Sequence, residues 1–288
     1  MNPVENYLAP ASLDEALAQL SSGEVTILAG GTDLTPQSQA GRVKFKPTLM
    51  NIRHITELGG IAQDGGEIRI GALTTVTEIM ESELIARHFP VLIEACHHFA
   101  SDQIRNASSL GGNLCNASPA GDMSIPLLAL DARVELTSKP NGARNTRAIP
   151  LNTFFTGPGK TRREASELLS CVRIPLPAPG YVARFLKFGT RVGLDISTIS
   201  IAIGGTLDAG VLSNVRVAFG AVAATPIRAA QTEAALEGQR LDAALIDRVA
   251  QVAHDEVKPI DDVRASAWYR KEMIRNMTKR MLEDVAHA

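Results

Sequence analysis

The sequence predicts an α+β protein, and three observations support this class. The first 58 residues alternate helix and strand patterns in a compact helix–strand–helix–strand unit. A Pro/Gly-rich stretch, LPAPG at residues 176–180, marks a boundary further along the chain. Beyond it, strand patterns come first and helix patterns second, which is typical of an α+β domain.

The N-terminal unit is read from its apolar spacing. Residues 12–20, SLDEALAQL, predict a helix that Ser12 and Glu15 start with a capping box. Two short apolar runs, VTILA (25–29) and PTLMNI (47–52), predict buried strands.

A short helix is expected between these two strands. Thr35 is predicted to cap it, with Pro36 at its first position, where a missing N–H has no cost. Gly41 fits its end.

Further elements follow from the same patterns. Thr75 and Glu78 make a second capping box, for a helix that ends near Glu81. The other predicted elements before the boundary are a strand at 67–73, a helix at 91–99, a helical turn and strand over 124–138, and mixed strand and loop at 147–155 and 167–177.

Composition excludes several classes of protein. Of 288 residues, 45% are hydrophobic and 21% charged, and the net charge of −2 offers no electrostatic footprint for nucleic acid. No apolar run approaches the roughly 20 residues of a membrane-spanning helix. The first 17 residues lack the pattern of a secretory signal, so we expect a cytoplasmic protein.

No metal site is predicted. Cys96, Cys115 and Cys171 are far apart and match neither zinc nor iron–sulfur spacing. His97 and His98 are adjacent, so on a helix they point about 100° apart and make poor joint ligands.

The first candidate site is the turn Ala29-Gly30-Gly31-Thr32-Asp33-Leu34. Adjacent glycines allow close approach of a ligand, and N–H groups after a strand and before a helix can form an anion nest. The turn therefore suits a diphosphate, although a plain tight turn with a helix cap fits it as well. Asp33 would repel phosphate, so it is expected to accept backbone N–H bonds or to bind a sugar hydroxyl.

The second candidate site is the segment from Ile104 to Asp122, which has neither helical nor strand periodicity. Its small polar side chains cannot pack a core, so its buried backbone groups need partners, which a polar ligand can supply. A surface loop is the alternative, but such a loop would rarely be so free of Lys and Glu.

Several motifs are absent. Gly159-Lys160-Thr161 resembles the end of a Walker A loop, but Phe154 stands where that pattern requires glycine. There is no G-x-G-x-x-G and no G-x-S-x-G. No pair of carboxylates and no Ser-His-Asp arrangement stands out, so we predict no catalytic residue.

Five motifs in order resemble a known family. They are AGGTDL (29–34), FASDQIRNASSLGGNLCNASPAGD (99–122), FFTGPGKT (154–161), ELLSCVRIP (167–175) and KFGTRVGLDIS (187–197). Together they look like the FAD-binding medium subunit of the molybdenum hydroxylases, which include carbon monoxide dehydrogenase, xanthine dehydrogenase and 4-hydroxybenzoyl-CoA reductase. The resemblance extends over essentially the whole chain.

The resemblance implies a fold and a domain division. Two α/β subdomains would hold FAD between them, as in flavoproteins of the vanillyl-alcohol-oxidase type, and a C-terminal antiparallel sheet with helices would follow. The expected domains are residues 1–58, 59–176 and 177–288.

The resemblance also implies FAD-binding residues. The first loop would hold the diphosphate through backbone N–H groups and Thr32, Leu169 would touch the flavin ring, and Lys187 would stand near it. A fixed cation there would favour reduced, anionic flavin, whereas the sequence alone favours a solvated strand lysine. The full expected set is Ile27, Leu28, Ala29, Gly30, Gly31, Thr32, Asp33, Leu34, Phe99, Ser109, Leu110, Gly111, Gly112, Asn113, Asn116, Asp122, Leu169 and Lys187. Nearby, Arg191 and Asp195 could pair structurally.

The implied function is electron transfer. In such enzymes a large subunit holds the molybdenum cofactor, a small subunit holds two [2Fe–2S] clusters, and FAD on the medium subunit passes electrons to an external acceptor. The assembly expected is a dimer of heterotrimers. This chain lacks the cysteine-containing insertion of cluster-bearing relatives, so FAD alone is expected on it. A stand-alone flavin oxidoreductase and an assembly protein without cofactor are the rival hypotheses.

Overall fold

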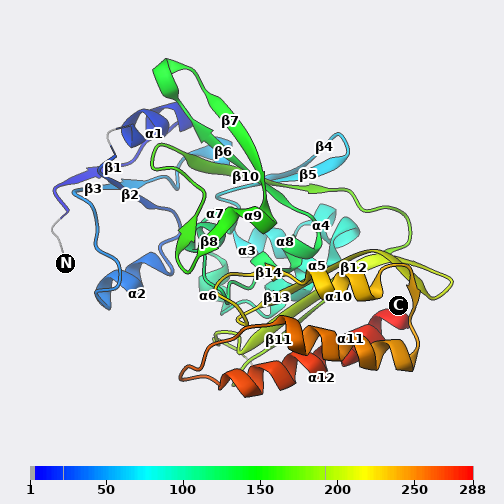
Figure 1. Ribbon diagram of the computed structural model, residues 1–288. Coiled ribbons are helices and arrows are strands. Elements are labelled where there is room, and N and C mark those ends of the chain that lie inside the picture. Colours follow the sequence, from blue (N-terminus) through cyan, green and yellow to red (C-terminus); the bar gives the residue numbers. More distant parts are fainter. Residues whose placement is uncertain (1–3, 22, 192, 288) are drawn as a thin grey trace.

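The computed structural model describes residues 4–21, 23–191 and 193–287. Three units follow one another along the chain, each built on its own sheet (Figure 1). The N-terminal unit lies to one side of a central antiparallel sheet, and the C-terminal sheet with its helices lies on the other side of the central helices. The predicted α+β class is confirmed.

The N-terminal unit is a parallel three-stranded sheet in the order β1-β3-β2. Its strands are β1 (Asn6–Leu8), β2 (Val25–Leu28) and β3 (Thr48–Asn51), and its helices are α1 (Leu13–Leu20), α2 (Leu34–Gln39) and the 3-10 turn η1 (Thr56–Leu58). The apolar stripe of α1 packs into a core that also holds the buried Met50 of β3. This unit places the turn after β2 beside the central unit.

The start of α1 differs in one detail from the predicted capping box. Ser12 Oγ accepts the N–H of Glu15 at 3.3 Å as expected. The Glu15 carboxylate, however, accepts the N–H of Ala11 at 2.9 Å, one residue earlier than a capping box requires. The predicted cap by Ser12 is therefore confirmed, whereas the predicted return bond from Glu15 to the N–H of Ser12 is wrong.

The helix α2 begins earlier than predicted. Gly31 has a left-handed backbone with φ +73°, and its carbonyl already accepts the N–H of Thr35 at 3.1 Å. Asp33 therefore holds the N-cap position, and Pro36 lies inside the first turn, where its missing N–H still has no cost. The predicted cap at Thr35 is wrong, while the end before Gly41 is confirmed.

The central unit is a five-stranded antiparallel sheet in the order β4-β5-β10-β6-β7. Its strands are β4 (Ile61–Asp64), β5 (Glu67–Gly71), β6 (Arg133–Ser138), β7 (Asn145–Pro150) and β10 (Leu168–Pro175). The helices before β6 are α3 (Val76–Met80), α4 (Glu83–His88), α5 (Pro90–His97), α6 (Asp102–Arg105), α7 (Leu110–Asn116) and α8 (Ser124–Ala129). The predicted capping box of Thr75 and Glu78 starts α3.

Short elements fill the second half of this unit. They are η2 (Pro140–Gly142), α9 (Leu151–Phe154), β8 (Phe155–Gly157) and β9 (Lys160–Thr161). Because β8 and β9 pair as a hairpin, the segment FFTGPGKT makes a compact projection beside α7.

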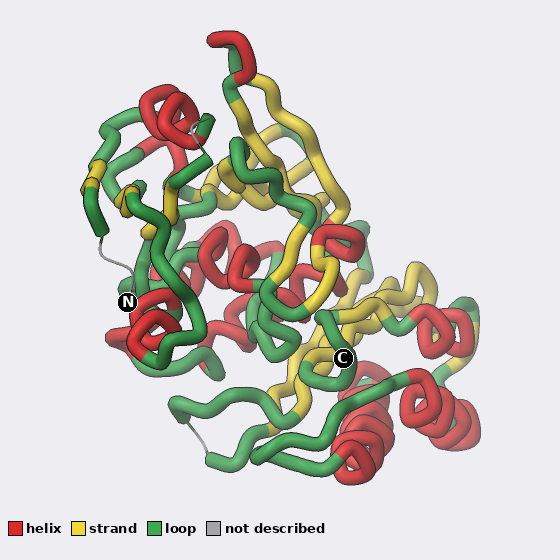
Figure 2. The backbone as a smooth tube through the Cα atoms, turned by 60° about the vertical axis from the view of Figure 1, so that its left-hand side comes forward, coloured by secondary structure: helices red, strands yellow, loops and turns green. Residues whose placement is uncertain are grey.

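The C-terminal unit is a second antiparallel sheet covered by helices on one face (Figure 2). Its strands are β11 (Tyr181–Phe188), β12 (Ile199–Asp208), β13 (Val211–Gly220), β14 (Ile227–Arg228) and β15 (Gln239–Arg240), and its helices are α10 (Ala230–Leu236), α11 (Ala243–Glu256) and α12 (Ala267–Ala286). Apart from the short β15, which follows α10, the strands precede the helices as predicted.

The two faces of β12 bury different side chains. Ile199, Ile201 and Ile203 belong to the core shared with α10, α11 and α12. Ala202 between them belongs to the central core, on the face that α8 covers. Small residues there let α8 approach closely: a Cβ at Gly220 would lie 2.9 Å from the Ile125 side chain. The central and C-terminal units are therefore packed together.

Within the described ranges, no helix combines the length and apolar character needed to cross a membrane.

Candidate functional site

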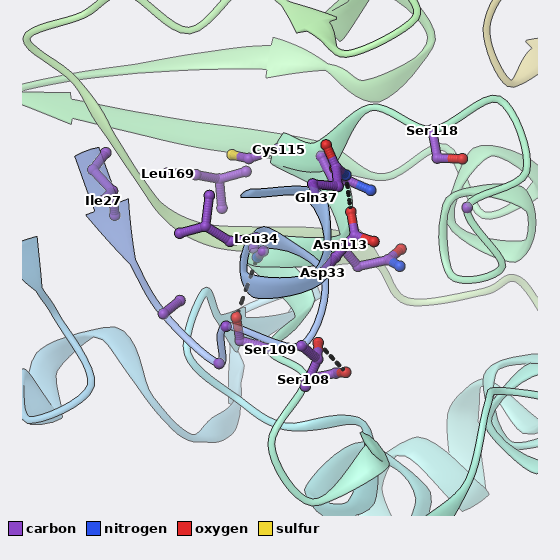
Figure 3. Close-up of a pocket in the computed structure, with 18 of the residues that line it drawn as sticks. Ile27, Asp33, Leu34, Gln37, Ser108, Ser109, Asn113, Cys115, Ser118 and Leu169 are labelled. Carbon is purple, nitrogen blue, oxygen red and sulfur yellow. Dashed lines mark hydrogen bonds between the residues drawn. The ribbon is translucent and has the colours of Figure 1, made fainter. Parts of the chain in front are cut away.

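A cleft of about 930 Å³ runs along the junction of the units. This volume lies near the upper end of ordinary ligand sites, which are roughly 300–1,000 Å³. Its walls come from β2 and the turn before α2, from the segment between α5 and α8, from β8 to β10, and from the loop after β11. Figure 3 shows Ser108 and Ser109 at the entry to α7, with Asn113 further along the same helix.

The first glycine-rich turn packs directly against the second at the cleft. A Cβ at Gly30 would lie 1.9 Å from the Ala107 carbonyl oxygen, so no larger residue fits without moving the backbone. Thr32 Oγ1 and Ser108 Oγ are 2.9 Å apart and hydrogen-bonded. The two segments that the sequence singled out are therefore in direct contact.

Asp33 directs its carboxylate to a side chain of α2 and not to backbone N–H groups. It makes no capping bond to the N–H groups of α2. It accepts instead from the side-chain amide of Gln37, which also donates to Asn116 Oδ1 at 3.0 Å. The predicted backbone bonds are wrong, and Gln37 connects the first segment with the second.

The second segment contains a helix, which corrects the prediction of an irregular stretch. Ser109 Oγ accepts the N–H of Gly112 at 3.2 Å and caps α7. Leu110 and Leu114, four residues apart, are fully buried. A Cβ at Gly111 would lie 2.8 Å from that of Ala72. Close packing against the central sheet thus outweighs the low helix propensity of two glycines.

Asn113 presents an unsatisfied acceptor on this helix. Its Oδ1 is buried and has no hydrogen-bond partner among the described residues. A buried polar atom without a partner costs about 1–3 kcal/mol, so an N–H or O–H of a ligand in the cleft would offset this cost. A cleft that holds such an atom fits a polar cofactor, such as FAD.

Lys187 lies behind the cleft wall. Its side chain is only 7% exposed, and its ammonium donates to Asp122 Oδ2 at 2.7 Å, the Asp195 carbonyl at 2.9 Å and the His98 carbonyl at 3.1 Å. The alternative of a solvated strand lysine is therefore wrong. The fixed cation expected near the flavin ring is therefore not an isolated charge, because the Asp122 carboxylate pairs with it.

Asp122 itself lines the cleft. Burial raises the pKa of its carboxyl group, while the Lys187 ammonium and a hydrogen bond from Ser197 Oγ at 2.8 Å oppose that increase. Asp122 thus joins the end of the second segment to both ends of the loop that follows β11.

That loop is closed by Asp195. Its carboxylate accepts the N–H groups of Thr190, Arg191 and Ile196, and these bonds lower its pKa although burial raises it. The suggested pairing of Arg191 with Asp195 exists only through the backbone N–H, because the guanidinium donates to the Leu194 carbonyl.

Most expected site residues come together on the cleft. Those that line it are Ile27, Ala29, Gly30, Gly31, Thr32, Asp33, Leu34, Phe99, Ser109, Gly111, Gly112, Asn113, Asn116, Asp122 and Leu169. Leu28, Leu110 and Lys187 are not among the lining residues.

Other lining residues were missed. They include Gln37, Lys46, Thr156, Gly159, Lys160, Thr161, Arg163, Leu194 and Ile196. The rejected Walker A match contained part of the signal, since Gly159, Lys160 and Thr161 do lie on the cleft, although not as a P-loop.

The thiols and possible metal ligands offer no further chemistry in the described part of the chain. The three cysteines are free, and burial raises the pKa of Cys96 to about 12 and of Cys115, on the cleft wall, to about 11. A thiol with so high a pKa is a poor nucleophile at neutral pH. No group of three or more potential metal ligands occurs in the described residues.

Comparison with known proteins identifies the family. Residues 2–177 match the family of FAD-binding domains in molybdopterin dehydrogenases, and residues 184–285 match the C-terminal domain of CO dehydrogenase flavoproteins. The chain belongs to this flavoprotein family. The resemblance inferred from the five motifs is confirmed, and with it the assignment as an FAD-binding oxidoreductase subunit.

Individual relatives match along nearly their whole length. The xanthine dehydrogenase FAD-binding subunit of Escherichia coli O157:H7 is 34% identical over 286 residues, covering 98% of this chain and 96% of the relative. The carbon monoxide dehydrogenase medium chain of Afipia carboxidovorans is 32% identical, covering 96% and 95%.

Solved structures of related enzymes contain chains with the same fold. A chain of carbon monoxide dehydrogenase from Hydrogenophaga pseudoflava superposes with a TM-score of 0.91 at 32% identity, covering 97% of this chain and 96% of that one. A chain of the reconstituted enzyme from Oligotropha carboxidovorans superposes with a TM-score of 0.93 at 30% identity, covering 100% and 99%. The expected fold is thereby confirmed.

Proposed function

We propose that this chain is the FAD-carrying electron-transfer subunit of a molybdenum-containing hydroxylase. The observation that supports this most directly is the cleft, where the two glycine-rich segments of the family motif meet at Gly30 and Ala107. The names of relatives, among them xanthine dehydrogenase, nicotinate dehydrogenase and carbon monoxide dehydrogenase, agree with such a role.

Different residues on the cleft would bind different parts of FAD. Gly30, Gly31 and Thr32 would take the diphosphate through their backbone N–H groups, because all three residues line the cleft. Asn113 Oδ1 would accept a hydrogen bond from the cofactor. The apolar side chains of Ile27 and Leu169 would cover its rings and exclude water. The site residues expected from the family are thus a binding set, with no acid or base among them assigned to catalysis.

When bound, FAD supplies one- and two-electron redox chemistry, which suits a subunit between one-electron clusters and a two-electron acceptor. The protein contributes orientation, access and electrostatics. We propose a large molybdenum-cofactor subunit and a small [2Fe–2S] subunit as partners, in a dimer of heterotrimers. Relatives whose names contain "medium chain" or "medium subunit" support a complex of several subunits.

Two further expectations stay predictions. The division into domains at residues 58/59 and 176/177 is supported by the three larger sheets, each of which lies within one of these ranges. The cytoplasmic location is supported by three free cysteines, which suit a reducing compartment.

The test is reconstitution of the purified full chain. We expect it to bind FAD, to turn yellow, and to be reduced by dithionite, but not to oxidise purines, aldehydes or carbon monoxide unless its partner subunits are added. Substrate turnover by the chain alone would contradict the relay role and favour a stand-alone oxidoreductase. Failure to bind FAD would favour an assembly protein.

A further inference from the structure

Helix α7 is hydrogen-bonded to the N-terminal unit near both of its ends. At its start, Thr32 Oγ1 bonds to Ser108 Oγ, two residues before the helix begins. At its end, Gln37 Nε2 donates at 3.0 Å to Oδ1 of Asn116, the last residue of the helix. Gln37 lines the cleft but belongs to neither glycine-rich segment, so the second bond gives a role to a residue that the family motifs do not contain.

The direction of this second bond is set by Asp33. Gln37 Nε2 also donates to the carboxylate of Asp33, four residues earlier in the chain (Figure 3). An ionised carboxylate can only accept hydrogen bonds, so it must face the NH2 group of Gln37 and not its carbonyl oxygen. The same NH2 group then faces Asn116 and requires an acceptor there, which is Oδ1.

The amide of Asn116 consequently turns its NH2 group away from Gln37. Its Nδ2 has no hydrogen-bond partner among the described residues and is not one of their buried unpartnered atoms, so it is accessible. Asn116 lines the cleft, three residues after Asn113 and therefore on the same face of α7. Two unused N–H groups are thus available to a ligand in the cleft.

We propose that Gln37, held by Asp33, is a positioning residue that orients the Asn116 amide as a donor to the diphosphate of FAD. The inference rests on the proposed function, since it takes FAD as the ligand of the cleft. Diphosphate oxygens accept hydrogen bonds, and a charged acceptor makes a stronger bond than a neutral one. Through Gln37, Asn116 is joined to the residue that directly follows Gly30-Gly31-Thr32, so its amide lies near the turn proposed for the diphosphate.

This arrangement gives the Asp33 carboxylate a use beside an anion. In direct contact with the diphosphate, the carboxylate would repel it. Acting through two amides, it ensures that the last group in the chain presents N–H donors and not a carbonyl oxygen.

The test is a double-mutant cycle for FAD binding by the flavin-free full chain. Its variants are Gln37→Leu, Asn116→Leu and the double variant. The control is Gln39→Leu, which makes the same change at an exposed position of α2 outside the cleft. Affinity is measured by quenching of flavin fluorescence, and phosphorus NMR of the bound FAD reports on the surroundings of its diphosphate.

We expect Asn116→Leu to weaken FAD binding by about ten-fold and Gln37→Leu by about three- to ten-fold, the equivalent of one hydrogen bond. The double variant should bind within about two-fold of Asn116→Leu, because Gln37 acts through Asn116. Both single changes should shift the phosphorus signals of bound FAD. Gln39→Leu should leave the affinity and the signals unchanged.

Two results would overturn the proposal. If the losses from the two single changes multiplied in the double variant, Gln37 would act independently of Asn116. If affinity fell while the phosphorus signals stayed the same, Gln37 would only hold the two units together. A parent chain that bound no FAD would instead contradict the proposed function itself.

Discussion

The ammonium of Lys187 lies 2.7 Å from the carboxylate of Asp122, and both groups are nearly buried. Asp122 forms part of the cleft wall, and Lys187 sits behind it. The lysine also donates to the carbonyls of His98 and Asp195, so it ties α5 and the loop after β11 to the end of the second glycine-rich segment. Lys187 is thus a positioning residue. Together with Asp122 it forms an ion pair that has no net charge.

Removal of the Lys187 ammonium should lower the free energy of unfolding. Lys187→Gln would leave the buried Asp122 carboxylate without its partner, and loss of one member of a buried pair typically costs about 3–5 kcal/mol. We expect the free energy of unfolding in urea to fall by about this amount. The double variant Lys187→Gln/Asp122→Asn should cost less than the sum of the two single changes. Lys279→Gln, which breaks the exposed pair with Asp247, is the control and should cost at most about 1 kcal/mol. Equal effects at the two lysines would contradict the buried pair.

Gly30 should tolerate no side chain. In Gly30→Ala the new Cβ would lie 1.9 Å from the Ala107 carbonyl oxygen, so the two walls of the cleft must separate. We expect loss of about 2 kcal/mol of stability or more, by the range seen for overpacking, and a lower FAD content after purification. The comparison is Gly66→Ala, where nothing lies within 4 Å and the change should stay within about 1 kcal/mol. Normal FAD content in Gly30→Ala would show that the contact is unimportant.

Asn113 should contribute to FAD binding without contributing to the stability of the flavin-free chain. In Asn113→Leu the buried acceptor without a partner disappears, so the flavin-free chain should keep its stability or gain up to about 1 kcal/mol. The affinity for FAD should fall by roughly three- to ten-fold, the equivalent of one hydrogen bond. Isothermal titration and thermal unfolding of the same preparations measure the two effects. Ser38→Ala removes another buried unpartnered oxygen, away from the cleft, and should leave FAD affinity unchanged.

Asp262 should contribute to acid unfolding. Burial raises its pKa, but hydrogen bonds from Arg270 and from the backbone N–H groups of Arg264 and Ala265 outweigh this and lower it from 3.8 to about 2. Because this pKa is lower in the folded chain than in the unfolded chain, the ionised carboxylate stabilises the fold above about pH 4. This stabilisation is lost as the pH falls from about 4 to about 2. Because the residue is partly exposed, solvent screening limits this contribution to about 1 kcal/mol or less. Urea unfolding between pH 6 and 3 should show a steeper loss for the parent chain than for Asp262→Asn. Parallel curves would show that the carboxylate has no such role.

The two glycine-rich segments differ in how far their local sequence specifies their structure. The turn after β2 was predictable, because a strand, two glycines and a helix start are local patterns. The helix α7 was not, because its two glycines and polar residues give it low intrinsic propensity, and only packing of Leu110 and Leu114 against the central sheet makes it favourable. In the same way, the start of α2 was misplaced because the left-handed Gly31 already turns the chain into the helix.

The sequence by itself determined the order of elements, the two glycine-rich segments and, through five ordered motifs, the flavoprotein family. These properties depend on local spacing and on residue type, which the linear chain contains. Only the tertiary structure decided that Lys187 is neutralised by Asp122, and that the two glycine-rich segments touch at Gly30 and Ala107. The physical reason is that charge compensation depends on distances between side chains 65 or more positions apart, which the fold alone sets.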